Sequence, residues 1–526
     1  MAYMRLLCLI LVALLLSTNS TNAAPRKSVE KAVPAPLVVS SDMNVGAFYF
    51  PGWSHADRWD CIAANDKVQH PLLGYYREGD PNAADWHIKW AREHGVSFFA
   101  FDFYTEGGSQ YLETALDDGF LKSRYIERFK FCLNWCNHGP VNEMTSGELE
   151  SFGDLVIKKY LTHPSYLRID GKPVVIILSG YSFVKNLGVD AARREFQHFK
   201  QRCSDAGLKG AYLVFCEGQI IGPNSLKESL AAGADAFCLY NFPYIGTTQT
   251  GPGKHAEYTY QHMIEKGSEL RNYWMQVTGG AFWPTVMPGW DRRPWCKDAD
   301  LIRTGSTPEL LEKDLRSARK QVNKDRVVMI EAWNEWGEGS VLEPSSENRF
   351  AYLDKVRNVF CPASPKHSDT DPKSLGMPLP AFNLKLPMID RWKFDFDTEG
   401  WSGTNVVEMH NAAGAIAAKS SSGDPQLNSP KTYLKSSDYK KLHLRMRLSK
   451  LDKVEDSGQV LWSTVELSMS EKTSATFAIF HDGKWHDYEI DLTANPNWRG
   501  TMDQLRIDPG SVNGAEIFID EIMFVR

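Results

Sequence analysis

The sequence predicts a (β/α)₈ barrel followed by a smaller all-β sandwich domain. Three observations support this fold class. Short apolar runs alternate with amphipathic stretches through roughly the first two thirds of the 526 residues, which is typical of a parallel sheet covered by helices. Eight such runs occur, the number that closes a barrel. Beyond them, apolar and polar residues alternate strictly, as in antiparallel strands with one solvated face.

The N-terminus has the features of a signal peptide. Arg5 precedes the apolar run Leu6–Leu16, and small or polar residues follow as far as Ala23. A run this short is typical of a signal peptide rather than a membrane span. We therefore expect residues 1–23 to be removed and the mature protein to be secreted or periplasmic, without stable membrane insertion. An uncleaved N-terminal anchor is the alternative.

The predicted barrel occupies residues 44–360 and follows a linker at 24–43 that is rich in Pro, Ser and Ala. Its strands are apolar on both faces, as expected when helices cover the sheet. A doubly wound open sheet is the alternative. The predicted strands are Val45–Phe50, Val96–Phe103, Phe129–Trp135, Pro173–Leu178, Ala211–Phe215, Ala236–Asn241, Ala281–Met287 and Arg326–Trp333.

Amphipathic segments between these strands predict the barrel helices. Helical spacing of apolar residues marks Asp85–Glu93, Ser146–Leu161 and Ala191–Ala206. The sequence Ser306-Thr307-Pro308-Glu309 is a helix start, since a capping hydroxyl precedes a proline and an early carboxylate.

A Pro-rich linker at residues 361–388 separates the barrel from a predicted β-sandwich at 389–526. Leu442, Leu444 and Met446 alternate there with polar residues, as expected for a jelly roll. The segments Phe394–Asp397 and Ile519–Ile522 resemble the first and last strands of galactose-binding-like domains. That resemblance implies glycan binding, and such domains sometimes hold a structural Ca²⁺ on oxygen ligands. A stability domain without a ligand is the alternative. We expect exposed tryptophans to form any sugar platform, the candidates being Trp462, Trp485 and Trp498.

Two glutamates near the end of the eighth strand are the strongest chemical signal. Glu335 and Glu338 lie in the segment Glu331–Gly339, at the barrel rim where active sites lie. Paired carboxylates suit cleavage of a glycosidic bond, in which one handles the proton of the departing oxygen and the other acts as base or nucleophile. Gly337 and Gly339 permit a tight turn between them. A salt-bridged surface loop is the alternative.

Other polar and aromatic residues also fall at or just beyond strand ends, where they could bind a hydroxyl or stack on a sugar ring. Loop packing or capping is the alternative for each. Glu331 is expected to be a buried, paired, structural carboxylate. The predicted substrate-binding residues are Tyr49, Asp102, Asn134, Trp135, Asn241, Trp290, Asp291 and Asn334.

Composition narrows the choice of partners. The formal net charge is −6, which argues against nucleic acid or an anionic membrane surface as the main partner. Cys132 and Cys136 have no matching second pair, so a zinc site there is weakly supported. We expect an oligo- or polysaccharide substrate and no cofactor or metal requirement for catalysis.

The segment Trp333-Asn334-Glu335-Trp336-Gly337-Glu338-Gly339, continuing to Glu343-Pro344, resembles a motif of the endo-α-mannosidase family (glycoside hydrolase family 99) and its WbsX-like relatives. The resemblance spans about residues 44–360. Supporting matches are Phe48–Trp53, Phe131–Trp135, Asp170–Pro173 and Met287–Asp291.

This resemblance implies a retaining, endo-acting hydrolase of α-linked glycans such as α-mannan. Glu335 would be the base that deprotonates the sugar 2-hydroxyl to give a 1,2-anhydro intermediate, and Glu338 would be the acid/base. The chain departs from the mannosidases at Gly337, where they carry histidine. A WbsX-like glycosyltransferase for surface polysaccharide and a non-catalytic glycan-binding protein remain alternatives.

Overall fold

A computed structural model describes residues 31–106, 108–136, 145–218, 222–248, 256–298, 301–452 and 455–526. The predicted signal peptide lies outside the described residues. Within the described ranges, no helix is both long enough and apolar enough to cross a membrane.

Eight parallel strands form the barrel, in the order β10-β13-β1-β2-β4-β6-β7-β8. Between β8 and β10 the ring is closed by a parallel bridge from Phe237 to Phe282 and by the Trp283 N–H, which donates to the Phe237 carbonyl at 2.7 Å. The predicted barrel is therefore confirmed. The strands are β1 (Asn44–Tyr49), β2 (Phe98–Glu106), β4 (Lys130–Trp135), β6 (Lys172–Leu178), β7 (Tyr212–Glu217), β8 (Ala236–Leu239), β10 (Thr285–Val286) and β13 (Val327–Ile330).

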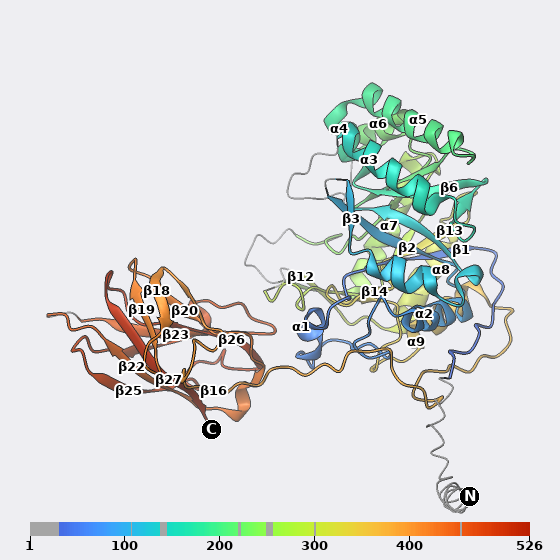
Figure 1. Ribbon diagram of the computed structural model, residues 1–526. Helices are drawn as coiled ribbons and strands as arrows, with labels where there is room; N and C mark the ends of the chain where they lie inside the picture. Colours follow the sequence, from blue (N-terminus) through green and yellow to red (C-terminus); the bar gives the residue numbers. More distant parts are fainter. Residues whose placement is uncertain are drawn as a thin grey trace, which may run out of the picture. The chain divides into compact units, whose positions relative to one another are not determined.

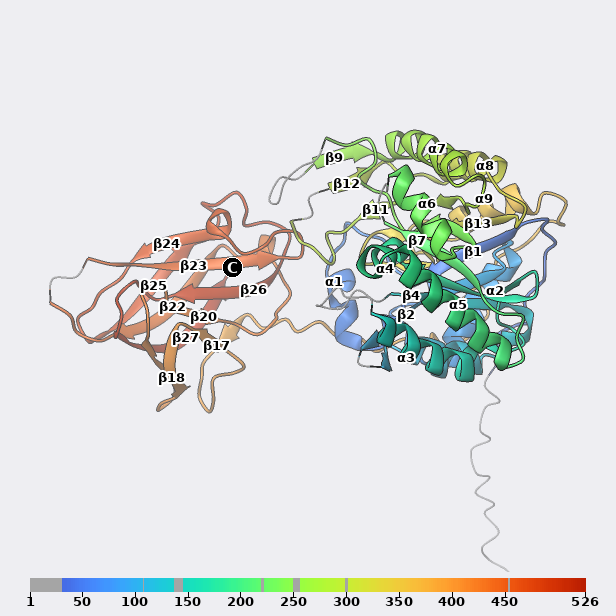
Figure 2. The ribbon, with the colours of Figure 1, turned by 90° about the horizontal axis from the view of Figure 1, so that it is seen from above.

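Helices surround these strands (Figures 1 and 2). The α-helices are α1 (Asp60–Ala63), α2 (Pro81–Glu93), α3 (Ser146–Val156), α4 (Gly180–Leu187), α5 (Val189–Asp205), α6 (Pro223–Ala232), α7 (Tyr260–Val277), α8 (Pro308–Lys320) and α9 (Ala351–Phe360). Short 3₁₀ or π segments are η1 (Ala56–Trp59), η2 (Ala115–Gly119), η3 (Phe120–Lys122), η4 (Ile126–Arg128), η5 (Ile157–Leu161), η6 (Ser436–Asp438) and η7 (Glu471–Thr473).

The predicted helix start before α8 is present in the structure. The Thr307 hydroxyl accepts the Leu310 N–H at 3.3 Å, and Pro308 occupies the first turn. Leu311, Leu315 and Ala318 form the buried stripe of this helix. The cap satisfies one of the free N–H groups at the helix end, and the stripe seats α8 against the barrel.

Short strands add to the loops of the barrel. Strand β13 ends at Ile330 rather than continuing to Trp333 as predicted, and a hairpin of β14 (Asn334–Glu335) and β15 (Ser340–Val341) follows it. A three-stranded sheet and two short flanking strands complete the set. They are β9 (Ala256–Thr259), β11 (Trp290–Asp291), β12 (Leu301–Thr304), β3 (Ser109–Tyr111) and β5 (Arg168–Ile169).

The C-terminal domain consists of two antiparallel sheets that share one apolar core. One sheet contains β16 (Arg391–Trp392), β18 (Val406–Asn411), β19 (Ile416–Ser420), β22 (Lys441–Leu448), β25 (Trp485–Asp491) and β27 (Glu516–Val525). The other contains β17 (Ser402–Thr404), β20 (Gln426–Asn428), β21 (Leu434–Lys435), β23 (Ser457–Thr464), β24 (Ser474–Ala478) and β26 (Thr501–Asp508). The alternation predicted in β22 is present, since its apolar residues are buried and its polar residues are more exposed.

One expectation for this domain is corrected. Trp462 is fully buried and Trp498 is 9% exposed, and both belong to the sandwich core. Neither can serve as an exposed platform. Trp485 is 36% exposed, and the guanidinium groups of Arg445 and Arg447 lie over its ring. A predicted sugar platform is therefore limited to Trp485.

Candidate active site

A cavity of about 470 Å³ opens at the C-terminal ends of the barrel strands, where enzymes of this fold have their active sites. Both predicted catalytic residues line it. The full lining is Phe50, Arg58, Asp102, Tyr104, Cys136, Leu178, Tyr240, Asn241, Arg292, Trp295, Glu335 and Glu338.

The β14–β15 hairpin places the two glutamates. Glu335 ends β14, and Glu338 follows in the turn, where its N–H donates to the Glu335 carbonyl at 3.1 Å. Gly339 has a φ of +65°, a left-handed conformation that favours glycine. Asn334 attaches the hairpin to the end of β1, since its amide accepts the Phe50 N–H and donates to the Phe50 carbonyl, each at 2.9 Å.

Tyr240 links Glu335 to Asp102 across the cavity wall. Its hydroxyl lies 2.7 Å from Asp102 Oδ2 and 3.0 Å from Glu335 Oε1. Asp102 also accepts a 2.8 Å hydrogen bond from the Asn134 amide through Oδ1. One hydroxyl proton faces two carboxyl groups, so a protonated carboxyl here would satisfy both contacts.

The buried carboxyl groups have raised pKa values. Burial raises the pKa of Glu338 to about 7, against the opposing effect of the Arg292 cation. Burial also raises the pKa of Asp102 to about 7, although its hydrogen bonds with Asn134 and Tyr240 lower it. The pKa of Glu335 is well above its usual value because of burial and of the charges on Glu338 and Asp102. These groups therefore share protons near neutral pH.

Glu331, expected as a buried paired carboxylate, is fully buried. Its Oε2 accepts a 2.8 Å hydrogen bond from the Ser340 hydroxyl. Burial and the nearby charge on Glu338 raise its pKa well above the ordinary value. Glu331 is not among the residues that line the cavity.

Cationic and aromatic side chains complete the cavity wall. Arg292 Nε lies 3.5 Å from Glu338 Oε1, and Arg58 comes from η1. The Trp295 indole stacks on Trp53, with ring centroids 5.4 Å apart. It also covers Gly337, because a Cβ at that glycine would lie 1.5 Å from Trp295 Nε1. The indole thus fills the space that a side chain at 337 would need.

The predicted substrate-binding residues are placed in three ways. Asp102 and Asn241 line the cavity with the glutamates. Asn134 and Asn334 stand behind it and hold Asp102 and the hairpin.

The remaining four lie elsewhere. Tyr49 contacts His87 through its hydroxyl at 3.2 Å, and Trp135 stacks on Phe152. Trp290 and Asp291 line a separate hollow of about 330 Å³, where Asp291 pairs with Arg293.

Several cavity residues were not predicted. Tyr240 lies one residue beyond β8 and directly precedes Asn241, which was predicted, so its place at a strand end was a usable signal. Tyr104 extends β2 beyond its predicted end at Phe103. Arg58, Arg292 and Trp295 come from loops without a strand pattern, so their contact with the cavity depends on how the loops fold.

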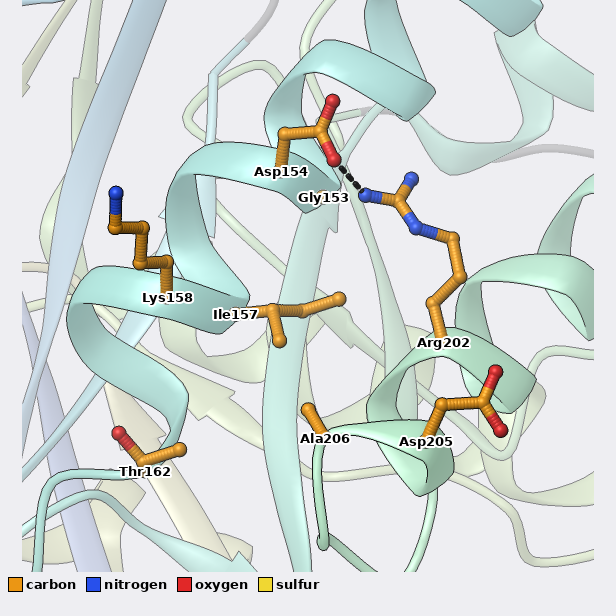
Figure 3. A pocket seen from close by; sticks show the side chains of 8 residues that line it. All are labelled: Gly153, Asp154, Ile157, Lys158, Thr162, Arg202, Asp205 and Ala206. Carbon is orange, nitrogen blue, oxygen red and sulfur yellow. Dashed lines mark hydrogen bonds and ion pairs between the residues drawn. The ribbon is translucent and has the colours of Figure 1, made fainter.

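A further depression, of about 460 Å³, lies on the outside of the barrel between α3, η5 and α5 (Figure 3). The Asp154 carboxylate and the Arg202 guanidinium form an ion pair there, while Ile157 points into the space between the helices. None of the predicted site residues lines this depression.

Comparison with known proteins gives one family match. The family model described as glycosyltransferase WbsX matches residues 65–356. Two curated proteins named uncharacterized protein WxcX, from two strains of Xanthomonas campestris pv. campestris, are 24% identical over 311 residues. The alignment covers 55% of this chain and 42% of each relative, so the chain spans less than half the length of the curated relatives it matches.

Solved structures similar to the barrel include a glycoside hydrolase-like protein, with a TM-score of 0.48 and 19% identity over 63% of this chain and 97% of that one. Another is an endo-α-mannosidase of glycoside hydrolase family 99 from Bacteroides thetaiotaomicron, with a TM-score of 0.45 and 19% identity over 60% of this chain and 96% of that one. The family match includes the cavity residues from Asp102 to Glu338, whereas Phe50 and Arg58 precede it.

Proposed function

The chain belongs to the WbsX family, and from this premise and the geometry of the cavity we propose that it hydrolyses α-linked glycosidic bonds in an oligo- or polysaccharide. One observation carries the proposal. Glu335 and Glu338 line the same cavity, whose volume of about 470 Å³ falls in the range of small-ligand sites. Most glycoside hydrolases use two carboxyl groups that flank the scissile bond.

Glu338 is assigned the acid/base role. Because its pKa is about 7, a substantial fraction of it is protonated at neutral pH and can donate a proton to the departing oxygen. The resulting carboxylate then accepts a proton from the attacking water. Arg292, 3.5 Å away, stabilises the carboxylate form between these steps.

Glu335 is assigned the base that acts on the sugar 2-hydroxyl. In the state with Glu338 protonated, one of the charges that raises the pKa of Glu335 is absent. The Tyr240 hydroxyl, 3.0 Å away, then stabilises the Glu335 carboxylate. After deprotonation, the 2-oxygen attacks the anomeric carbon and the glycosidic C–O bond breaks. Water then opens the 1,2-anhydro ring at the anomeric carbon, and the 2-oxygen takes back the proton held by Glu335. Two inversions at the anomeric carbon leave its configuration retained.

The substrate is proposed to be an α-mannan-like or related polysaccharide, cleaved internally. The N-terminal sequence supports export of the enzyme to the periplasm or beyond the cell. Structural Ca²⁺ and glycan binding in the C-terminal domain remain predictions.

A second candidate function is glycosyl transfer, because the description of the matched family model is a glycosyltransferase. The same carboxyl pair could support transfer to a sugar hydroxyl in place of water. A nucleotide-sugar donor would distinguish this activity from hydrolysis.

The test is release of reducing ends from a panel of α-linked polysaccharides by the wild type, Glu335→Gln and Glu338→Gln. We expect hydrolysis by the wild type and a loss of about 10²-fold or more in each variant. Glu150→Gln, on the exposed surface of α3, serves as the matched control and should retain full activity.

Equal activity in the wild type and Glu338→Gln, or none across the panel, would remove the hydrolase assignment. Consumption of a labelled nucleotide sugar, lost in Glu338→Gln, would establish the transferase instead.

A further inference from the structure

A compact group of metal-ligand side chains lies outside the cavity, where helix α2 meets the segment that follows α9. His94 directly follows α2, and His367 and Asp369 belong to that later segment. One ligand atom from each residue lies within 4.8 Å of the other two. Among the described residues, no other group of three or more His, Cys, Asp or Glu side chains brings its ligand atoms within this distance.

We propose that His94, His367 and Asp369 bind a zinc ion that fastens the segment after α9 to the end of α2. The spacing of their ligand atoms supports this assignment. Asp369 Oδ1 lies 3.1 Å from the Nε2 atoms of both histidines. Tetrahedral zinc has bonds of about 2.0 Å to nitrogen and oxygen, which places its ligand atoms about 3.3 Å apart.

The three polar atoms that face one another in this group, both Nε2 atoms and Asp369 Oδ1, are buried without hydrogen bonds to any described residue. His94 is 0% exposed, and the His367 side chain is 7% exposed. Among the described residues, neither Nε2 atom nor Asp369 Oδ1 has a hydrogen-bond partner with acceptable geometry. Buried polar atoms of this kind are costly, and a metal ion at their centre would satisfy all three.

His94 is held in the orientation that a ligand needs. Its Nδ1 lies 2.7 Å from the Trp90 carbonyl oxygen, so Nδ1 donates to that carbonyl and Nε2 is the nitrogen that faces Asp369. Metal-binding histidines almost always donate their other ring N–H to a carbonyl, a carboxylate or a water molecule. The Phe350 ring stacks on the imidazole, with an interplanar angle of 9°.

Either of two further carboxylates can supply the fourth ligand. Glu93 Oε2 lies 3.5 Å from His367 Nε2, and Asp354 Oδ1 lies 3.6 Å from His94 Nε2. Glu93 Oε2 is also buried without a hydrogen bond. Two imidazoles and two carboxylates are a recognised donor set for zinc.

The proposed role is structural. Helix α2 leads into strand β2, so its C-terminal end lies at the rim opposite the strand ends that form the cavity, where residues serve stability. Hydrogen bonds already link α2, α9 and the segment that follows α9. Arg357 donates to the Glu93 and Pro365 carbonyl groups, and the Trp90 indole donates to the Thr370 carbonyl at 2.9 Å. Zinc would join the same elements.

The metal-free alternative is an ionic cluster with a protonated His94. In that cluster the His94 imidazolium pairs with the Asp369 and Asp354 carboxylates, whose nearer oxygens lie 3.1 Å and 3.6 Å from His94 Nε2. The two arrangements differ in metal content and in their response to a chelator.

The test uses the full chain, produced with added ZnSO₄ and dialysed to remove loosely bound ions. Elemental analysis should find about one zinc per chain in the wild type and in His198→Gln, an exposed histidine on α5. His367→Gln should retain less than about a tenth of that amount. EDTA should lower the Tm of the wild type by several degrees, and Zn²⁺ should restore it, because a ligand that binds only the folded state stabilises it.

The proposal is wrong if the wild-type chain lacks stoichiometric zinc or holds another metal at this stoichiometry. It is also wrong if His367→Gln retains the zinc. If the ionic cluster is correct, EDTA leaves the Tm unchanged while His367→Gln lowers it. None of these readouts depends on enzymatic activity.

Discussion

At the scale of single residues, protonation controls the proposed chemistry. Glu335, Glu338 and Asp102 all line one cavity, and each has a raised pKa. Burial and mutual repulsion make it unfavourable for all three carboxyl groups to be ionised at once. The proposed acid therefore keeps its proton near neutral pH, while Tyr240 stabilises the proposed base.

The first prediction concerns the pH dependence of hydrolysis. Activity requires protonated Glu338, so it should fall as the pH rises above about 7. It should also fall at low pH, where the base becomes protonated. Arg292 lowers the pKa of Glu338, so Arg292→Gln should move the alkaline limb of the kcat/KM profile upward by up to about one pH unit. An unmoved or lowered limb would contradict the assignment of Glu338 as the acid.

At the scale of elements, the hairpin β14–β15 packs against the loop that carries Trp295. This packing is possible because Gly337 has no side chain. The sequence resemblance drew attention to this glycine because the mannosidases carry histidine there. In this structure the Trp295 indole occupies that space. The size of residue 337 and the position of Trp295 are therefore coupled.

The second prediction follows from this coupling. Gly337→Ala places a Cβ where Trp295 Nε1 now lies, so the hairpin or the loop must shift and hydrolysis should fall by about 10-fold or more. Removing the ring in Gly337→Ala/Trp295→Ala should return the hairpin to its position and recover kcat beyond the single variant. Gly218→Ala, where a Cβ meets nothing within 4 Å, is the control. A harmless Gly337→Ala would show that the two elements are not in contact.

The elements also show how far sequence reasoning reaches. The apolar runs located all eight barrel strands because strands buried on both faces cannot contain charged residues for long. The same reasoning failed at Trp333, since the chain leaves the barrel strand there to form the β14–β15 hairpin, which Asn334 attaches to the Phe50 backbone and no periodicity reveals. Asn334 and Asn134 were predicted to bind sugar, but their amides are used in positioning other groups. Loop residues such as Arg58 and Trp295 could not be predicted, because their partners lie far away in the sequence.

At the scale of the whole molecule, the cavity lowers the stability of the fold at alkaline pH. A buried carboxyl with a raised pKa binds a proton in the folded state that the unfolded chain releases. Its ionised form therefore costs stability above the folded pKa, and the cost disappears below the unfolded pKa. For Glu338 this window extends from about 4.5 to about 7.

The third prediction is that Glu338→Gln, although inactive, is more stable than the wild type at alkaline pH. At pH 8 the free energy of unfolding should rise by about 1–3 kcal/mol, because the amide avoids the cost of the buried charge. The difference should shrink as the pH falls toward 5. Urea unfolding at both pH values measures it, with Glu150→Gln as the unchanged control. A variant less stable than the wild type at pH 8 would mean that the buried charge is compensated in the folded state.

One thiol of this chain offers a position for a fluorescent label that reports ligand binding in the cavity. Of the cysteines from Cys61 to Cys361, all free, only Cys296 is exposed, and it adjoins Trp295 in the cavity wall. A fluorescent maleimide should attach to this position first, since the others are shielded from solvent to a greater degree. Its emission would then report the arrival of a glycan beside the indole, even in a variant that turns nothing over.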